Sequence, residues 1–136
     1  MGYYVHLEPG NSMLAGGLHE PDPGRLASWR AAIDRDPRPL KKIAAAAAFR
    51  RTFGEVHGER LKTVPRGYPR HHPEADPLRL KSITVIRQIP DAHVIAPTFL
   101  HEALKTLKAM KPFLKCLESL PQSAPGAWPG GNRPAG

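Results

Sequence analysis

The sequence has 136 residues, of which 20 are basic and 12 acidic, so its formal net charge is +8. This length fits one domain, and the single cysteine excludes an intrachain disulfide framework. No run approaches the ~20 apolar residues of a membrane span, and the first ten residues lack the pattern of a signal peptide, so we expect a cytoplasmic protein with no membrane partner.

Two strands are predicted at the start of the chain. Residues 3–7 alternate in character, which is typical of a half-buried strand, and Pro9-Gly10-Asn11 forms a turn into a return strand over residues 12–18. Gly16 and Gly17 in the second strand indicate a bulge or a close approach of backbone.

Two helices are predicted next. The first has Asp22 as its N-cap and Pro23 as its first residue. The second begins at Pro37, capped by Asp36, and runs to residue 53, where Gly54 stops it. Apolar side chains in both helices are expected to face the core: Leu26, Trp29 and Ile33 in the first, and Leu40, Ile43, Ala47, Phe49 and Phe53 in the second.

A third strand and a last helix are predicted after these. Residues 82–89 are β-branched and mostly apolar, and Pro90-Asp91 closes the strand. The helix begins near Pro97-Thr98, and Pro112 is expected to kink or split it. Its apolar stripe contains Leu100, Leu104, Leu107, Met110, Leu114 and Leu117. Residues 121–136 are rich in Pro and Gly and predict a disordered tail.

These elements predict an α+β fold in which a small antiparallel sheet packs against about three helices. The sheet consists of the N-terminal hairpin and strand 83–87, and residues 1–120 form a single domain. A strand that starts at the third residue has no flanking element to cover it. We therefore expect the domain to be the C-terminal fragment of a larger one and only marginally stable.

Residues 60–88 contain most of the unusual polar chemistry, and we call the part before the third strand, residues 60–81, the central loop. Its basic set predicts an anion-binding site formed by Lys62, Arg66, Gly67, Arg79 and Lys81. Arginine matches the geometry of phosphate or carboxylate, and Gly67 lets backbone N–H groups approach a ligand. The alternative is pairing within the chain, for instance of Arg79 with Glu74 or Asp76.

The central loop also contains two candidate metal ligands, His72 and Asp76, because imidazole and carboxylate groups bind divalent ions. The spacing matches no established metal motif, however, and neither a metal nor another cofactor is predicted. The Asp76-Pro77 pair favours a structural role, in which Asp76 caps a short helix beginning at Pro77 and accepts hydrogen bonds from the N–H of Leu78 or Arg79.

Three stretches of the sequence form a set: GYYVHLEPGNSMLAGGLHEPDP, then DPRPLKKI with FRRTFG, then GERLKTVPRGYPRHHPEADPLRLKS. In this order and spacing they resemble the bacterial family called domain of unknown function 2461, over residues 2–120. The run over residues 61–82 is the most specific part. The resemblance implies an α+β domain of no established activity. It also implies a further N-terminal portion of helices and strands, with a basic segment, upstream of the hairpin.

The function predicted from these observations is a binding module for an anionic ligand, either a phosphate-bearing molecule or a nucleic acid, that uses the basic central loop. Residues 41–81 carry ten basic and four acidic groups, so the positive field is centred there. A solvated surface that aids solubility is the other interpretation of this charge. The alternative function is an enzyme of unknown reaction, with a site around Arg66, His72 and Asp76 that the N-terminal portion completes. Protein partners are not predicted.

Overall fold

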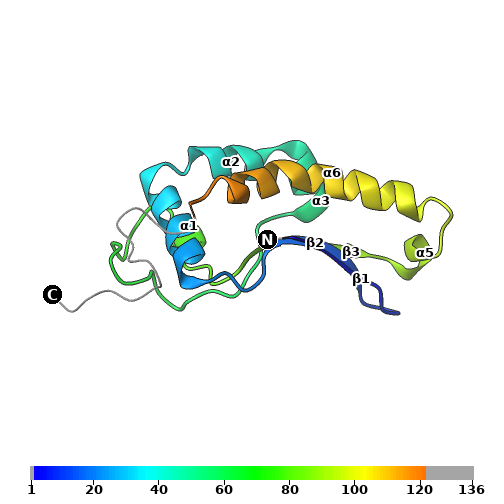
Figure 1. Cartoon of the computed structure of the whole chain (residues 1–136), viewed down its shortest axis with the longest axis horizontal. Helices are drawn as coiled ribbons and strands as arrows, with labels where there is room; N and C mark the ends of the chain where they lie inside the picture. The colour runs from blue at the N-terminus through cyan, green and yellow to red at the C-terminus, as the bar shows by residue number, and fades with distance from the viewer. Residues whose placement is uncertain (1, 122–136) are drawn as a thin grey trace.

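A computed structural model describes residues 2–121 of the chain. Strands β1 (Gly2–His6), β2 (Ser12–Leu18) and β3 (Ile83–Ile89) form an antiparallel sheet in the order β1-β2-β3. Four helices precede β3 and two follow it (Figure 1): α1 (Pro23–Arg35), α2 (Arg38–Ala45), α3 (Ala47–Phe53), α4 (Ala75–Leu78), α5 (Asp91–Val94) and α6 (Phe99–Glu118). The predicted α+β class and the pairing of the hairpin with the third strand are confirmed.

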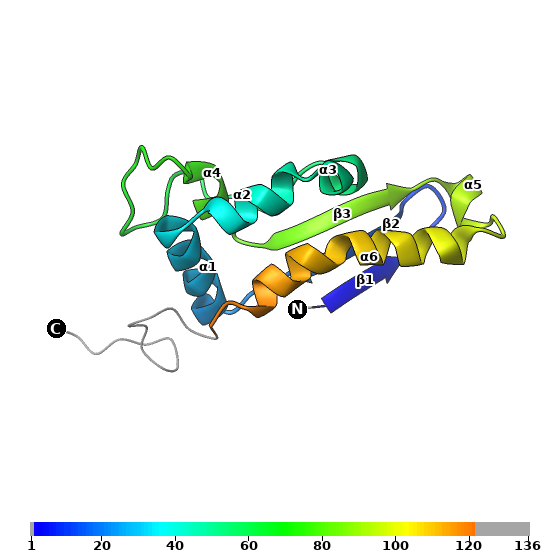
Figure 2. The same ribbon diagram turned by 90° about the horizontal axis from the view of Figure 1, so that it is seen from above.

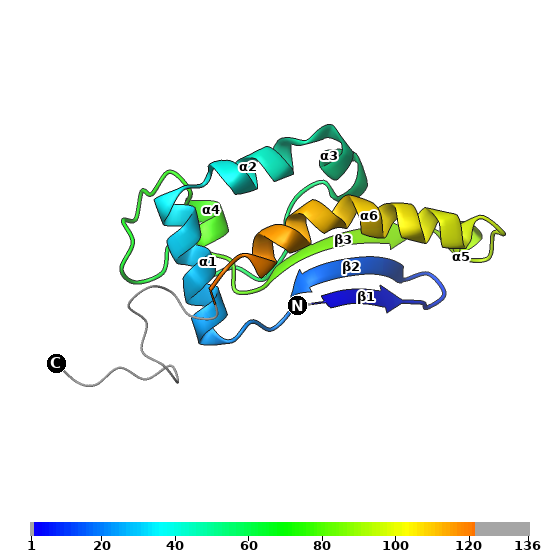
Figure 3. The ribbon, with the colours of Figure 1, turned by 45° about the horizontal axis from the view of Figure 1, so that its top comes forward.

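Helix α6 lies over β2 on one face of the sheet, α3 contacts β3, and α2 packs against α3 and α6; we call these three helices the helical layer (Figures 2 and 3). Helix α1 stands at the end of the sheet where β2 finishes. The core between the layers contains Trp29, Phe49, Phe53 and Phe113 together with aliphatic side chains of β3 and α6. Gly16 allows α6 to approach β2, because a Cβ at that position would collide with the Met110 side chain. The predicted close approach of backbone is confirmed at Gly17, where a Cβ would collide with the carbonyl oxygen of Ile83.

Helix α1 begins as predicted, because its signals are local. The Asp22 carboxylate accepts a hydrogen bond from the N–H of Arg25 at 2.9 Å, and Pro23 is the first helical residue. Trp29 and Ile33 are buried.

The predicted helix over residues 37–53 is wrong as a single element, because Ala46 is extended and separates α2 from α3. Leu40 and Phe49 are nine residues apart, so a continuous helix would place them about 180° apart. The break turns α3 so that Phe49 and Phe53 enter the core, while Leu40 packs at its margin. With this division and the two short helices α4 and α5, residues 2–121 contain six helices rather than about three.

Two expectations about exposure are also wrong. Strand β1 is not half-buried, since it is the edge strand and α6 lies over β2. Leu100 and Leu104 of the predicted stripe are 71% and 57% exposed.

Helix α6 continues through Pro112 and is not split. Pro112 and Lys108 both lie on the exposed face, where water can reach the carbonyl that the missing N–H leaves free.

No helix within residues 2–121 combines the length and the apolar character needed to cross a bilayer. The predicted tail lies outside the described residues, apart from position 121.

Candidate anion-binding pocket

The positive charge of the described chain is concentrated on the helical layer. Helices α2, α3 and α6 carry nine basic and two acidic side chains, whereas the rest of residues 2–121 carries ten of each. All nine basic side chains are exposed. The helical layer is therefore the larger source of positive field, with nine basic minus two acidic side chains (+7), and the central loop, with six basic minus two acidic side chains (+4), is the smaller one.

Most of these cations have no acidic partner. Arg38 pairs with Asp36 at 2.8 Å, and Lys41 pairs with Glu74. The other seven form no ion pair within residues 2–121: Lys42, Arg50, Arg51, Lys105, Lys108, Lys111 and Lys115. Unpaired exposed cations at this density attract anions.

A pocket of about 470 Å³ opens between α3, β3 and α6. Its cations are Arg51 from α3, Arg87 from β3 and Lys105 from α6, and Glu102 is the one carboxylate in its lining. The other polar groups of the lining are Thr52, Thr98, His101 and Thr106. This volume is typical of pockets that hold small ligands.

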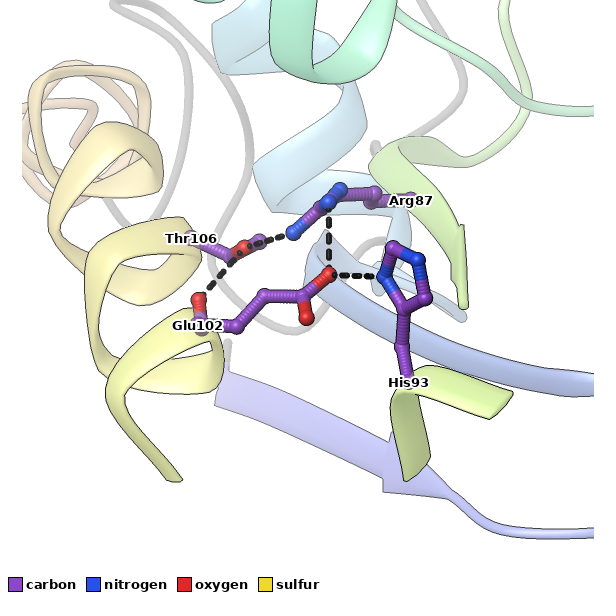
Figure 4. A network of polar contacts seen from close by, with 4 residues as sticks. All are labelled: Arg87, His93, Glu102 and Thr106. Atoms are coloured by element: carbon purple, nitrogen blue, oxygen red, sulfur yellow. Dashed lines mark hydrogen bonds and ion pairs between the residues drawn. The ribbon is translucent and has the colours of Figure 1, made fainter. Parts of the chain in front are cut away.

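A network of hydrogen bonds fixes the floor of the pocket (Figure 4). The Arg87 Nη2 donates to the Glu102 Oε1 at 2.7 Å, and Nη1 donates to the Thr106 hydroxyl at 2.6 Å. That hydroxyl in turn donates to the carbonyl of Glu102 at 3.0 Å. The Nδ1 of His93 lies 3.0 Å from the same Oε1 of Glu102. The network joins β3, α5 and α6.

The network determines which charges remain free. The contact with His93 lowers the pKa of Glu102, partial burial opposes this change, and the charge of Arg87 lowers the pKa further. Glu102 is thus ionised at neutral pH and offsets the charge of Arg87. Arg51 and Lys105 are left as the unpaired cations of the pocket, with the Thr98 hydroxyl and His101 beside them.

The central loop has a different environment, because α1 holds its backbone. The Trp29 indole N–H donates to the carbonyl of Pro77 at 2.9 Å. The Arg30 guanidinium donates to the carbonyls of Leu78 and Leu80 at 3.0 and 3.2 Å. Burial lowers the pKa of Arg30, which nonetheless stays charged. Leu78 and Leu80 are themselves core residues, so this part of the loop is scaffold.

The structure places two of the predicted anion-binding residues, Arg79 and Lys81, beside carboxylates of the chain. The Arg79 Nε donates to the carbonyl of Leu61 at 2.7 Å, and its Nη1 lies 3.5 Å from Asp76, as the intrachain alternative predicted. Lys81 lies 3.8 Å from Glu59, and the two line a separate pocket of about 240 Å³.

The remaining predicted residues, Lys62, Arg66 and Gly67, are exposed, and they do not line either of these two pockets. Their anion-binding role stays a prediction.

The two candidate metal ligands are also placed apart. The His72 Nε2 lies 2.7 Å from Asp34, and its Nδ1 accepts the N–H of Glu74 at 2.9 Å, so both ring nitrogens are engaged. Asp76 is exposed. Within residues 2–121, no three His, Cys, Asp or Glu side chains converge in a way that could hold a metal ion.

The predicted cap at Asp76 is wrong. Helix α4 begins at Ala75, so Asp76 lies inside it and Glu74 is at the cap position, with no side-chain cap bond. The N–H groups of Leu78 and Arg79 bond to backbone carbonyls instead. Pro77 fits within the first helical turn as well as at its start, since the first four N–H groups of a helix have no partner inside it.

A comparison with protein families identifies one match. The sequence profile of a family described as "Conserved hypothetical protein (DUF2461)" matches residues 1–115. The chain belongs to this family. The match confirms the resemblance seen in the sequence, and it includes both the central loop and the pocket of this DUF2461 chain. No curated protein and no solved structure matches the chain.

Sequence reasoning missed the pocket residues of the DUF2461 chain. One local signal existed: Arg87 is the single charged residue of the apolar strand ITVIRQI. A charge in such a strand requires a partner from the layer above it, and Glu102 and Thr106 of α6 supply one. Arg51 and Lys105 had no such signal, because they resemble any exposed cation of a helix.

Proposed function

We propose that the protein is a binding module for phosphate-bearing anions, and that the pocket between α3, β3 and α6 holds the phosphate group. One observation carries the proposal: three cations line the pocket, and its one carboxylate is already paired with Arg87. An incoming anion therefore meets two free cations and no free carboxylate of the lining.

Arg51 and Lys105 have complementary roles in this proposal. The Arg51 guanidinium offers a planar fork to two phosphate oxygens, and the Lys105 ammonium offers a compact point charge. Arg87 stays bound to Glu102 and Thr106, so it positions the floor of the pocket. The cations outside the pocket raise the local concentration of anions.

The proposal covers a nucleotide and the backbone of a nucleic acid, and these differ in how much of the helical layer they engage. A nucleotide occupies the pocket alone. A strand also passes along α6, where Lys108, Lys111 and Lys115 are exposed within three turns of the helix. A strand releases more counterions, so its affinity falls more steeply with salt.

Isothermal titration calorimetry tests the proposal with four probes: inorganic phosphate, adenosine triphosphate, adenosine, and a short single-stranded oligonucleotide. Each probe is titrated at low and at moderate salt. The phosphate-bearing probes are expected to bind and adenosine is not. Equal binding of adenosine, or binding that salt does not weaken, would contradict the proposal. A steeper loss with salt for the oligonucleotide than for adenosine triphosphate identifies the strand as the preferred ligand.

Variants assign the binding to the pocket. R51A and K105A are each expected to weaken adenosine triphosphate about tenfold, since each removes one charge-assisted contact. R35A is the matched control, because Arg35 is an exposed arginine on α1, outside the helical layer. The same two variants in the oligonucleotide titration show whether both ligands share the pocket.

The anion site and the enzyme site that the sequence predicted in the central loop remain proposals with less support. Anion binding at Lys62, Arg66, Gly67, Arg79 and Lys81 keeps the support of the sequence alone. The alternative of an enzyme around Arg66, His72 and Asp76 does too, and His72 would have to give up a bond to Asp34 or Glu74 to take part. A cytoplasmic location fits the proposed ligands, which are abundant in that compartment.

A further inference from the structure

The free polar side chains of the pocket follow one side of α6 from its start. Thr98, His101 and Lys105 all line the pocket. Because they are three and four residues apart in the sequence, they lie on the same side of the helix, with successive members about 5–6 Å apart. We call these three side chains the α6 stripe. Arg51 of α3 lines the same pocket.

None of the three side chains has a partner within residues 2–121. Thr98 is at the N-cap position of α6, but its side chain makes no cap bond. His101 and Lys105 are exposed, and they take part in none of the side-chain hydrogen bonds or ion pairs of this part of the chain. A hydroxyl, an imidazole and an ammonium group all carry hydrogen-bond donors. The α6 stripe therefore favours a ligand that brings acceptors and negative charge.

The other polar side chains of the lining, apart from Arg51, are already bonded. The Thr52 hydroxyl donates to a backbone carbonyl of its own helix at 2.7 Å. Arg87, Glu102 and Thr106 are bonded to one another (Figure 4). A ligand can thus form new polar contacts with Arg51 and the α6 stripe without breaking a bond of the chain.

The stripe continues into an apolar part of the pocket. Ala109 lies one turn beyond Lys105 on the same side of α6, and it also lines the pocket. Its side chain is a methyl group, which forms no hydrogen bond with a phosphate oxygen. A ligand whose first phosphate lies between Arg51 and Lys105 therefore places its other charged groups toward His101 and the start of α6.

We propose that the pocket binds a linear chain of phosphates, with one phosphate between Arg51 and Lys105 and the next along the α6 stripe. This inference rests on the proposed function and names its ligand class, a phosphoanhydride. The chain is either an inorganic polyphosphate or the tail of a nucleoside triphosphate. Thr98 and His101 are the residues that distinguish a chain of phosphates from a single phosphate.

The exposure of the stripe determines what a nucleoside would add. Thr98 and His101 are both exposed, so the chain of phosphates leaves the pocket toward solvent at the start of α6. A nucleoside attached to that end lies in water and adds little affinity. Inorganic tripolyphosphate and adenosine triphosphate are therefore expected to bind alike.

Isothermal titration calorimetry with the full chain tests the inference with four probes: inorganic phosphate, pyrophosphate, tripolyphosphate and adenosine triphosphate. All are titrated at one salt concentration and without divalent cations, which would coordinate the phosphates. Pyrophosphate and tripolyphosphate are each expected to bind at least about tenfold more tightly than phosphate. Adenosine triphosphate is expected to match tripolyphosphate within about threefold.

A double variant assigns the second phosphate to the stripe. T98V/H101A is expected to weaken tripolyphosphate at least about tenfold and phosphate less than about threefold, because the cations of the first phosphate are kept. Circular dichroism confirms that the variant is folded, and Thr98 makes no cap bond that its replacement would remove. T63V/H71A is the matched control, since it changes the same residue types at exposed positions of the central loop, and it is expected to bind all four probes like the wild type.

Three results would overturn the inference while leaving the proposed function in place. One is binding of phosphate as tight as that of tripolyphosphate. Another is that T98V/H101A weakens phosphate and tripolyphosphate equally, or weakens neither. The third is binding of adenosine triphosphate more than about tenfold tighter than tripolyphosphate, because recognition would then include the nucleoside. If no phosphate-bearing probe bound, the proposed function would fail and the inference with it.

Discussion

The central loop and the helical layer are both basic, but their charged groups are used differently. In the loop, Arg79 bonds to the carbonyl of Leu61, His72 is held at both ring nitrogens, and the carbonyls of Leu78 and Leu80 are bound by Arg30. In the layer, seven exposed cations have no acidic partner within residues 2–121. Arg60, Lys62, Arg66 and Arg70 of the loop are also exposed and have no acidic partner within residues 2–121. The two regions therefore differ in the bonds that hold the loop backbone and in the pocket that free cations of the layer line, rather than in the presence of free charge.

The largest loss of stability is expected at Trp29, the residue of α1 whose indole bonds to the central loop. Trp29→Ala removes a buried ring and its bond to Pro77, and should cost about 3–5 kcal/mol of unfolding free energy. Trp29→Phe keeps most of the ring and should cost about 1–2 kcal/mol. Urea denaturation measures both. If Trp29→Ala lost under about 1 kcal/mol, the loop would not be scaffold.

The next largest loss of stability is expected at Arg30. Arg30→Ala leaves the carbonyls of Leu78 and Leu80 without their donor, which should cost about 2 kcal/mol. The control Arg35→Ala removes an exposed arginine from the same helix and should stay within about 0.5 kcal/mol. Affinity for adenosine triphosphate should not change in either variant. Equal costs for the two variants would contradict a structural role of Arg30.

A smaller effect is expected at Glu102, in the floor of the pocket. Glu102→Gln keeps the size of the side chain but removes the charge that holds Arg87 and His93, and should cost about 1 kcal/mol at neutral pH. Because the pKa of Glu102 is lowered in the folded protein, this stabilisation is complete above its unfolded-state pKa and is lost as the pH falls through the folded-state pKa. The difference between wild type and variant should therefore vanish in acid.

Glu102→Gln also tests whether the carboxylate of the pocket opposes the binding of an anion. Removing the one carboxylate of the pocket lining should raise the affinity for adenosine triphosphate a few-fold, or about 0.5–1 kcal/mol. Glu74→Gln in the central loop is the control, and its affinity should match that of the wild type. A loss of affinity in Glu102→Gln would show that Glu102 supports binding through Arg87 rather than opposing it.

The smallest effect is expected at Asp76. Because its carboxylate is exposed and caps no helix, Asp76→Asn and Asp76→Ala should both remain within about 0.5 kcal/mol of the wild type in thermal or urea denaturation. A cost near 1 kcal/mol for Ala but not for Asn would restore the capping role that the sequence predicted.

The parts of the fold that were predicted correctly are those with local signals. Helix α1 has its cap, its proline and its apolar stripe within a short span, and the hairpin has its turn residues and alternation. The break at Ala46 was also readable, since Leu40 and Phe49 cannot face the core from one helix. The position of α6 over β2 rather than over β1 was not readable, because it depends on tertiary packing.

The pocket could not be predicted in the same way. Arg51, Arg87 and Lys105 come from three elements that only tertiary packing brings together. The density of polar residues in the central loop suggested a site. The intrachain partners of these residues, such as Asp34 and the carbonyl of Leu61, cannot be recognised from the sequence. Whether a cation is free depends on what is packed beside it.

The most direct test of the account compares two charge reversals of equal size. R51E/K105E reverses the free cations of the pocket, and K62E/R66E reverses two exposed cations of the central loop. Circular dichroism confirms that both are folded, and calorimetry measures adenosine triphosphate binding. We predict a loss of at least about 100-fold for R51E/K105E and less than about threefold for K62E/R66E. An equal loss in both variants, or a larger loss in K62E/R66E, would contradict the account.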